Sequence, residues 1–97
     1  LAVPPLGAAS AAAAVTKVRT AGKLHTGSPP RGAVALWTGG SHGYGHAALS
    51  LGGDRILTTD PPGHPGGVGE QPLSMPKNTW GLTFVGWTTW WGVELPT

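Results

Sequence analysis

The residues best suited to chemistry lie within residues 29–60, which read PPRGAVALWTGGSHGYGHAALSLGGDRILTTD. Here His46 follows a glycine-rich segment and begins an apolar one, and Thr58 and Asp60 come about a dozen residues later. An imidazole oriented by a polar partner can act as a general base and then as a general acid. Residues i and i+2 of a strand share a face, so a returning hairpin would bring both polar residues within reach of His46. Of the two, a carboxylate orients an imidazole better than a hydroxyl does.

The same histidine belongs to a candidate metal motif. His42 and His46 form a His-x-x-x-His pattern, which binds zinc when a helix places both rings on one face. Gly43 and Gly45 argue against a helix, and neither a cysteine nor a nearby glutamate completes a tetrahedral ligand set. We therefore expect no metal and no cofactor.

Each candidate also has a purely structural interpretation. A histidine in a glycine-rich loop, such as His46, is often only solvated or bonded to the backbone. Asp60 precedes Pro61 directly, so it is equally suited to ending a strand as a turn former. Ser41 and Ser50 are expected to be structural, because no Gly-x-Ser-x-Gly elbow is present.

The elements that must position these residues are short strands. Apolar runs separated by glycine and proline predict strands at 32–38, 46–52 and 54–60, and the Gly52-Gly53-Asp54 sequence predicts a tight antiparallel hairpin. The segment 61–72 holds four prolines and four glycines, so we expect a surface loop there. The tryptophan-rich tail predicts one or two closing strands around Gly86.

Residues 8–20 are the only good helix candidate, because alanine has the highest helix propensity and Gly22 provides a stop. Residues 21–31 then read as a proline- and glycine-containing linker. The predicted fold class is α+β, with an antiparallel sheet of four to six short strands and one N-terminal alanine-rich helix packed on it. We expect one domain, in which residues 1–31 form the helix and linker and residues 32–97 form the sheet.

Composition excludes several functions. The six basic residues are scattered and the formal net charge is +2, so no basic stripe for nucleic acid is present. No apolar run is long enough to predict a membrane span. The 97-residue chain contains no cysteine, which excludes disulfides, thiolate metal sites and thiol catalysis by its own residues.

The order of these motifs resembles the recurring segment of NlpC-like and CHAP-like peptidoglycan hydrolases of the actinobacterial phage lysin type. In those domains a Pro-x-Gly turn leads into a strand that ends in an aromatic residue. A Gly-His pair then opens the next strand, and a hairpin returns to a strand with a polar residue. The matching positions are Pro30-Arg31-Gly32, Trp37, Gly45-His46, Gly52-Gly53-Asp54, Thr58-Thr59-Asp60 and the closing Gly86-Trp87-Thr88. The resemblance covers about two-thirds of the chain.

The resemblance implies a papain-like site, in which a thiolate attacks a peptide carbonyl and a histidine serves as base and then acid. His46 matches the family histidine. The family's orienting group usually lies about a dozen residues later, across the hairpin, which falls on Thr58, with Asp60 two residues further on the same strand face. The resemblance therefore implies Asp60 in this role first, as the carboxylate, and Thr58 second. The implied substrate is bacterial cell-wall peptidoglycan, with substrate-binding roles for Trp37, Tyr44 and Trp87. A protein of this kind is extracellular or phage-encoded and acts at the bacterial cell wall.

The family's nucleophilic cysteine has no counterpart in this chain, which leaves two hypotheses. The first is a cysteine endopeptidase or amidase whose nucleophile lies before Leu1, as favoured by the absence of an initiator methionine, with these 97 residues inactive by themselves. The second is a pseudoenzyme that binds cell-wall peptide or glycan without cleaving it. It would use Trp37, Trp87 and the segment 61–72, and a sugar ring would stack on Trp37 or Trp90.

Overall fold

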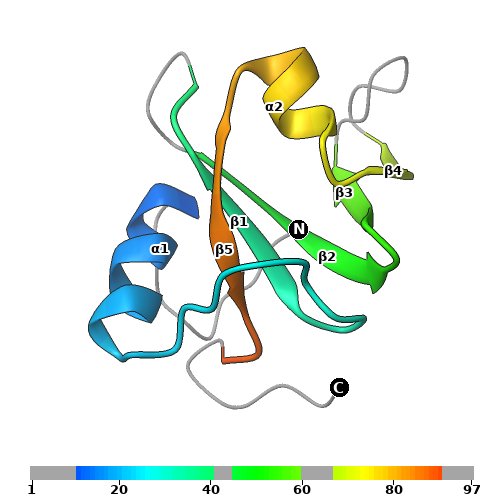
Figure 1. Ribbon diagram of the computed structural model, residues 1–97. Helices are drawn as coiled ribbons and strands as arrows, with labels where there is room; N and C mark the ends of the chain where they lie inside the picture. The colour runs from blue at the N-terminus through cyan, green and yellow to red at the C-terminus, as the bar shows by residue number, and fades with distance from the viewer. Residues whose placement is uncertain (1–10, 41–44, 60–66, 91–97) are drawn as a thin grey trace.

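The described part of the chain is an antiparallel sheet flanked by two helices, as Figure 1 shows. The computed structural model describes residues 11–40, 45–59 and 67–90. The elements in chain order are α1 (Ala11–Thr20), β1 (Val34–Thr38), β2 (His46–Gly52), β3 (Arg55–Thr59), β4 (Val68–Pro72), α2 (Met75–Trp80) and β5 (Thr83–Thr88). The strands form one five-stranded sheet in the order β4-β3-β2-β1-β5. The fold class is therefore α+β, as predicted.

The β2–β3 hairpin forms where the sequence predicted it. Gly53 and Asp54 both have positive φ, +57° and +58°, as the tightest two-residue hairpin turns require. The strands pair in the register Leu49 to Leu57 and Ser50 to Ile56. Because directly opposed residues share a face, this register places the even-numbered residues of β2 and β3 on the same side of the sheet.

The two faces of the sheet carry separate apolar cores. On one face, called here the Trp37 face, buried side chains of the sheet pack with Leu73, Trp80 and Phe84; the buried set is Ala35, Trp37, Ala48, Ile56 and Leu82. On the other face, called here the α1 face, Val34 and Leu36 pack against α1. Trp37 is opposed by His46 in the β1–β2 register, so His46 lies on the Trp37 face.

Helix α1 packs on the sheet, as expected of an alanine-rich helix with a partner. Its buried residues Ala14, Val15 and Val18 form one stripe toward the α1 face. The helix ends at the predicted stop: the amide of Lys23 donates to Val18 O and that of Gly22 to Arg19 O, with Gly22 at φ +72°. This is a Schellman motif, which needs a left-handed residue after the last turn.

The prediction of a surface loop over 61–72 is wrong in its second half. Val68–Pro72 forms β4, which pairs with β3 from Thr59 opposite Val68 to Arg55 opposite Pro72. The glycines and prolines that suggested a loop are tolerated because β4 is an edge strand, where a proline need not donate to a neighbour. Residues 60–66 lie outside the described part of the chain.

A second helix, α2, was not predicted, since residues 8–20 were the only helix candidate. At six residues it is too short for a helical periodicity to appear in the sequence. Its boundary signals are nevertheless present: Pro76 lies in the first turn and Gly81 caps the end at φ +69°. Within the described residues, neither helix is long and apolar enough to cross a membrane.

Candidate functional site: a histidine and threonine pair and an adjacent cavity

The strand pair β2–β3 brings His46 and Thr58 together on the Trp37 face. His46 Nε2 lies 2.6 Å from Thr58 Oγ1, a short hydrogen bond between side chains twelve residues apart. Thr58 is completely buried, whereas His46 is half-buried at the start of β2. The hairpin register thus produces the contact between the histidine and a polar residue of the returning strand that the sequence predicted.

The hydrogen-bond pattern also assigns the histidine proton. Thr58 Oγ1 donates to the carbonyl oxygen of Thr59 at 3.1 Å, and a hydroxyl has only one proton to donate. Thr58 must therefore accept from His46, so Nε2 of the imidazole carries the proton. In the neutral ring Nδ1 is then the basic nitrogen, and it is the atom that takes up a proton in general base chemistry.

Two tryptophans pack against the His46 ring. The ring centroid of Trp80 lies 5.0 Å away with an interplanar angle of 76°, and that of Trp37 lies 5.7 Å away at 45°. Trp80 comes from α2 and Trp37 from β1, so two neighbouring elements and the hydrogen bond to Thr58 of β3 hold the imidazole in place. The indole Nε1 of Trp37 is buried and has no hydrogen-bond partner among the residues that the structure describes.

Helix α1 does not contribute to this pair. Its buried stripe packs on the α1 face, whereas His46, Thr58 and Trp80 gather on the opposite face. A reacting group that uses His46 as its base must therefore approach from the Trp37 face or from the end of the sheet.

The aromatic residues predicted to bind substrate have different surroundings. Trp37 is 0% exposed, so its ring offers no exposed face for a sugar to stack on, whereas Trp90, the other residue of the stacking prediction, is half-buried. Trp87 is half-buried; its ring lies 4.6 Å from that of His25, and its Nε1 donates to Thr26 O at 3.1 Å. His25 and Trp87 also exchange two backbone hydrogen bonds of 2.8 Å, so Trp87 fastens the segment after α1 to the edge strand β5.

Some predicted site residues lie outside the described part of the chain, namely Asp60, Tyr44, His42 and Ser41. Ser50 is structural, as expected. It is buried, its Oγ donates to Pro29 O at 3.0 Å, and it accepts from the amide of Gly52 at 3.1 Å. This side chain ties the segment before β1 to the irregular end of β2.

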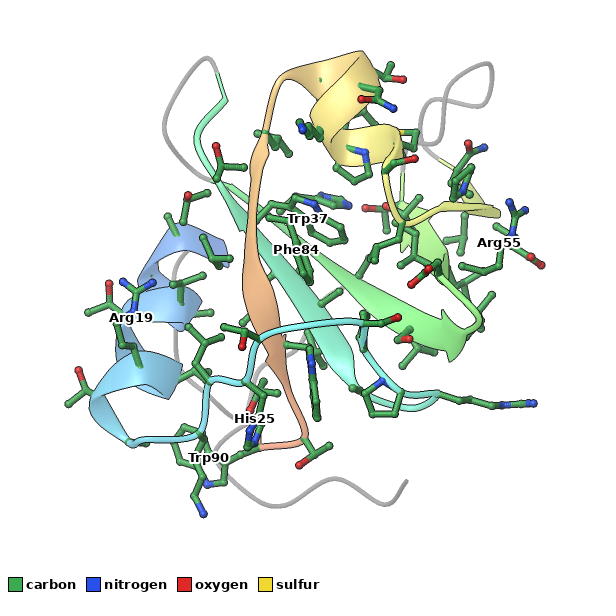
Figure 2. The ribbon with its side chains drawn as sticks, in the orientation of Figure 1. Arg19, His25, Trp37, Arg55, Phe84 and Trp90 are labelled. Atoms are coloured by element: carbon green, nitrogen blue, oxygen red, sulfur yellow. The ribbon has the colours of Figure 1, made fainter. Side chains whose placement is uncertain are left out.

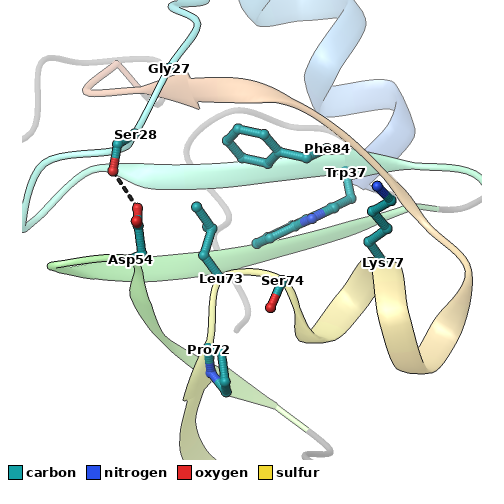
Figure 3. Close-up of a pocket in the computed structure, with 9 residues that line it drawn as sticks. All are labelled: Gly27, Ser28, Trp37, Asp54, Pro72, Leu73, Ser74, Lys77 and Phe84. Carbon is teal, nitrogen blue, oxygen red and sulfur yellow. Dashed lines mark hydrogen bonds between the residues drawn. The ribbon is translucent and has the colours of Figure 1, made fainter.

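A cavity of about 610 Å³ opens on the Trp37 face, shown in Figure 3. Its lining residues come from five separate parts of the chain: Gly27, Ser28, Trp37, Asp54, Pro72, Leu73, Ser74, Lys77 and Phe84. Trp37 belongs both to this cavity and to the surroundings of His46, although His46 itself does not line the cavity. In Figure 2 the side chains of Trp37 and Phe84 lie together near the middle of the sheet, and their ring centroids are 5.5 Å apart. Sequence reasoning missed this site because no single segment carries it.

The part of the chain that the structure describes contains no cluster of three or more potential metal ligands. Comparisons with protein-family models, with curated proteins and with solved structures gave no match.

Proposed function

We propose that this chain provides the histidine of a peptidoglycan hydrolase of the cysteine endopeptidase or amidase type. The observation that carries the proposal is the hydrogen bond from His46 Nε2 to Thr58 Oγ1, which leaves Nδ1 as the basic nitrogen. The order of motifs from Pro30 to Asp60 resembles that of NlpC-like and CHAP-like domains, and this resemblance suggests peptidoglycan as the substrate.

In the proposed reaction His46 Nδ1 accepts the proton of a thiol, and the thiolate attacks the carbonyl carbon of an amide in the cell-wall peptide. The imidazolium then returns the proton to the leaving amine as the carbon–nitrogen bond breaks, and water hydrolyses the thioester. The thiol has to come from outside these 97 residues, since the chain contains no cysteine. Thr58 acts as a positioning residue that holds the ring and its tautomer.

The test is release of soluble muropeptides from purified sacculi. Two proteins are compared: the 97-residue chain and the complete translation product of its gene, whatever the length of that product. We expect release by a product that includes a cysteine, loss of release in its His46→Ala variant, and no release by the 97 residues. Thr58→Val should lower kcat with little change in KM, because Thr58 contacts the base rather than the substrate.

Three outcomes would contradict the proposal. Release by the 97-residue chain would mean chemistry without a thiol. Lack of release by the complete product would remove the hydrolase function, as would full activity of its His46→Ala variant. A Thr59→Val variant is the matched control, because Thr59 neighbours Thr58 but its hydroxyl makes no hydrogen bond to His46.

A second candidate function, a non-catalytic module that binds the cell wall, is favoured by the cavity on the Trp37 face. Its volume of about 610 Å³ lies within the usual range of small-molecule sites. A pull-down of the 97-residue chain with sacculi tests it. Binding that survives His46→Ala would support the module, and lack of binding would exclude it.

A further inference from the structure

The cavity on the Trp37 face is closed in by three separate segments of chain. The loop at Gly27 and Ser28 forms one wall, the β2–β3 turn at Asp54 forms the next, and the stretch from Pro72 into α2 forms the third (Figure 3). A hydrogen bond from Ser28 Oγ to Asp54 Oδ1 joins the first two walls. These two walls are therefore joined by a side-chain hydrogen bond in addition to the backbone pairing of the sheet.

The interior of the cavity is apolar. Trp37, Leu73 and Phe84 line it, and Figure 3 shows them between Asp54 on one side and Lys77 on the other. Leu73 and Phe84 are half-buried, so they present accessible apolar surface to a ligand, whereas Trp37 forms the buried base. Such a surface favours an aliphatic or aromatic group over a fully polar one.

The two charged groups of the cavity are opposite in sign and have bonding capacity left. Asp54 is fixed in the hairpin turn at φ +58°, and among the described residues its carboxylate is bonded only at Oδ1, by Ser28. Lys77 is exposed on α2, and its side chain makes no ion pair with any described residue. Ser74, between them along the rim, makes no side-chain cap bond to α2. A carboxylate and an ammonium therefore face the same apolar space from opposite sides.

We propose that this cavity binds a short unprotected peptide with an apolar side chain. Its terminal ammonium would pair with Asp54, its terminal carboxylate with Lys77, and its side chain would cover Leu73 and Phe84. The charge pattern decides the class: a fatty acid offers no cation for Asp54, and a polyamine offers no anion for Lys77. The cavity volume of about 610 Å³ suits a di- or tripeptide better than a protein segment, which has no adjacent termini. The site does not depend on His46 or on the hydrolase proposal.

The experiment is a titration of the ¹⁵N-labelled 97-residue chain with the tripeptide Ala-Leu-Ala, followed by amide chemical shifts. We expect saturable shifts at Ser28, Asp54 and Lys77. The N-acetylated and C-amidated tripeptides should each bind about fivefold more weakly, the upper end for a solvent-exposed charge pair.

Two variants assign the contacts, and a third serves as the control. Lys77→Met should abolish the preference for the unprotected peptide over its amide, and Asp54→Asn should abolish the preference over the acetylated form. Asparagine suits the Asp54 position because it tolerates a positive φ and still accepts from Ser28. Lys23→Met removes an exposed charge that does not line the cavity, so it should leave both preferences unchanged.

The proposal is overturned if Ala-Leu-Ala causes no saturable shifts, if the blocked peptides bind equally well, or if Lys77→Met and Asp54→Asn keep both preferences. Shifts confined to His46 and Thr58 would also overturn it, because they would place the peptide at the other site. None of these results affects the hydrolase proposal, whose readout is muropeptide release.

Discussion

Thr58→Val is the most direct test of the site geometry. Threonine and valine have nearly the same shape, so the substitution removes the hydroxyl at a position that is 0% exposed and leaves the packing largely intact. Two hydrogen bonds disappear, the one of 2.6 Å from His46 Nε2 and the one of 3.1 Å to Thr59 O. The imidazole then loses the acceptor that determines which nitrogen carries the proton.

The expected loss of stability follows from burial. Leaving a buried donor without an acceptor costs about 1–3 kcal/mol, and the lower end applies because His46 is half-buried and water can reach its ring. We therefore expect Thr58→Val to lower the free energy of unfolding by about 1 kcal/mol. In a domain of this size that corresponds to a fall in Tm of about 4–8 °C. The greater apolarity of valine acts in the opposite direction and keeps the value near this lower end.

A double-mutant cycle with His46→Ala isolates the pair from other contacts. Urea unfolding, followed by tryptophan fluorescence, should give a coupling energy of about 1 kcal/mol between the two positions. The ¹⁵N shifts of the imidazole should show the Nε2-protonated tautomer in the unmodified protein and a mixture in Thr58→Val. A coupling energy near zero, together with an unchanged tautomer, would refute the proton assignment. Thr59→Val, on the neighbouring position, should leave the tautomer unchanged.

Three further predictions concern what holds the site in place. Gly45→Ala should destabilise the fold by more than about 2 kcal/mol in urea unfolding, because φ is +70° and the added Cβ would lie 2.3 Å from Trp37 O. Gly53→Ala, also at positive φ but with open space around it, should cost only about 1 kcal/mol, and equal losses would contradict the steric argument. Ser50→Ala should cost about 1–3 kcal/mol and increase hydrogen exchange at the Gly52 amide, and unchanged exchange would argue against the bond to Ser50 Oγ. Arg55→Ala should change stability by less than about 1 kcal/mol, since its 2.7 Å ion pair with Glu70 is about half exposed; a larger fall in Tm would show that the pair is not a surface interaction.

The sequence determined the central part of the fold because its signals there are local. The Gly52-Gly53-Asp54 turn predicted the hairpin, and both central residues do have the positive φ that such a turn needs. Gly22 predicted the end of α1 for a similar reason, since a left-handed residue closes the last helical turn. A turn or a cap depends on a few neighbouring residues, so its outcome can be read from them.

Elements that depend on a partner were not determined in this way. Strand β4 has the composition of a loop and exists because β3 offers it an edge to pair with. Helix α2 is too short for periodicity, yet its Trp80 packs against the His46 ring. In both cases the stabilising contacts come from residues that are distant in sequence, so local propensity gave the wrong answer or none.

The same distinction between local signals and tertiary contacts applies to the candidate site. The spacing from His46 to the returning strand predicted a polar partner, but it left Thr58 and Asp60 as alternatives, because residues two apart share a strand face. Only the register and the path of the side chains decided that Thr58 Oγ1 meets Nε2, and only the bond from Thr58 to Thr59 O decided which nitrogen carries the proton. The cavity depends wholly on tertiary structure: Ser28, Asp54 and Lys77 line the same space because a loop, a hairpin turn and a helix converge on one face of the sheet.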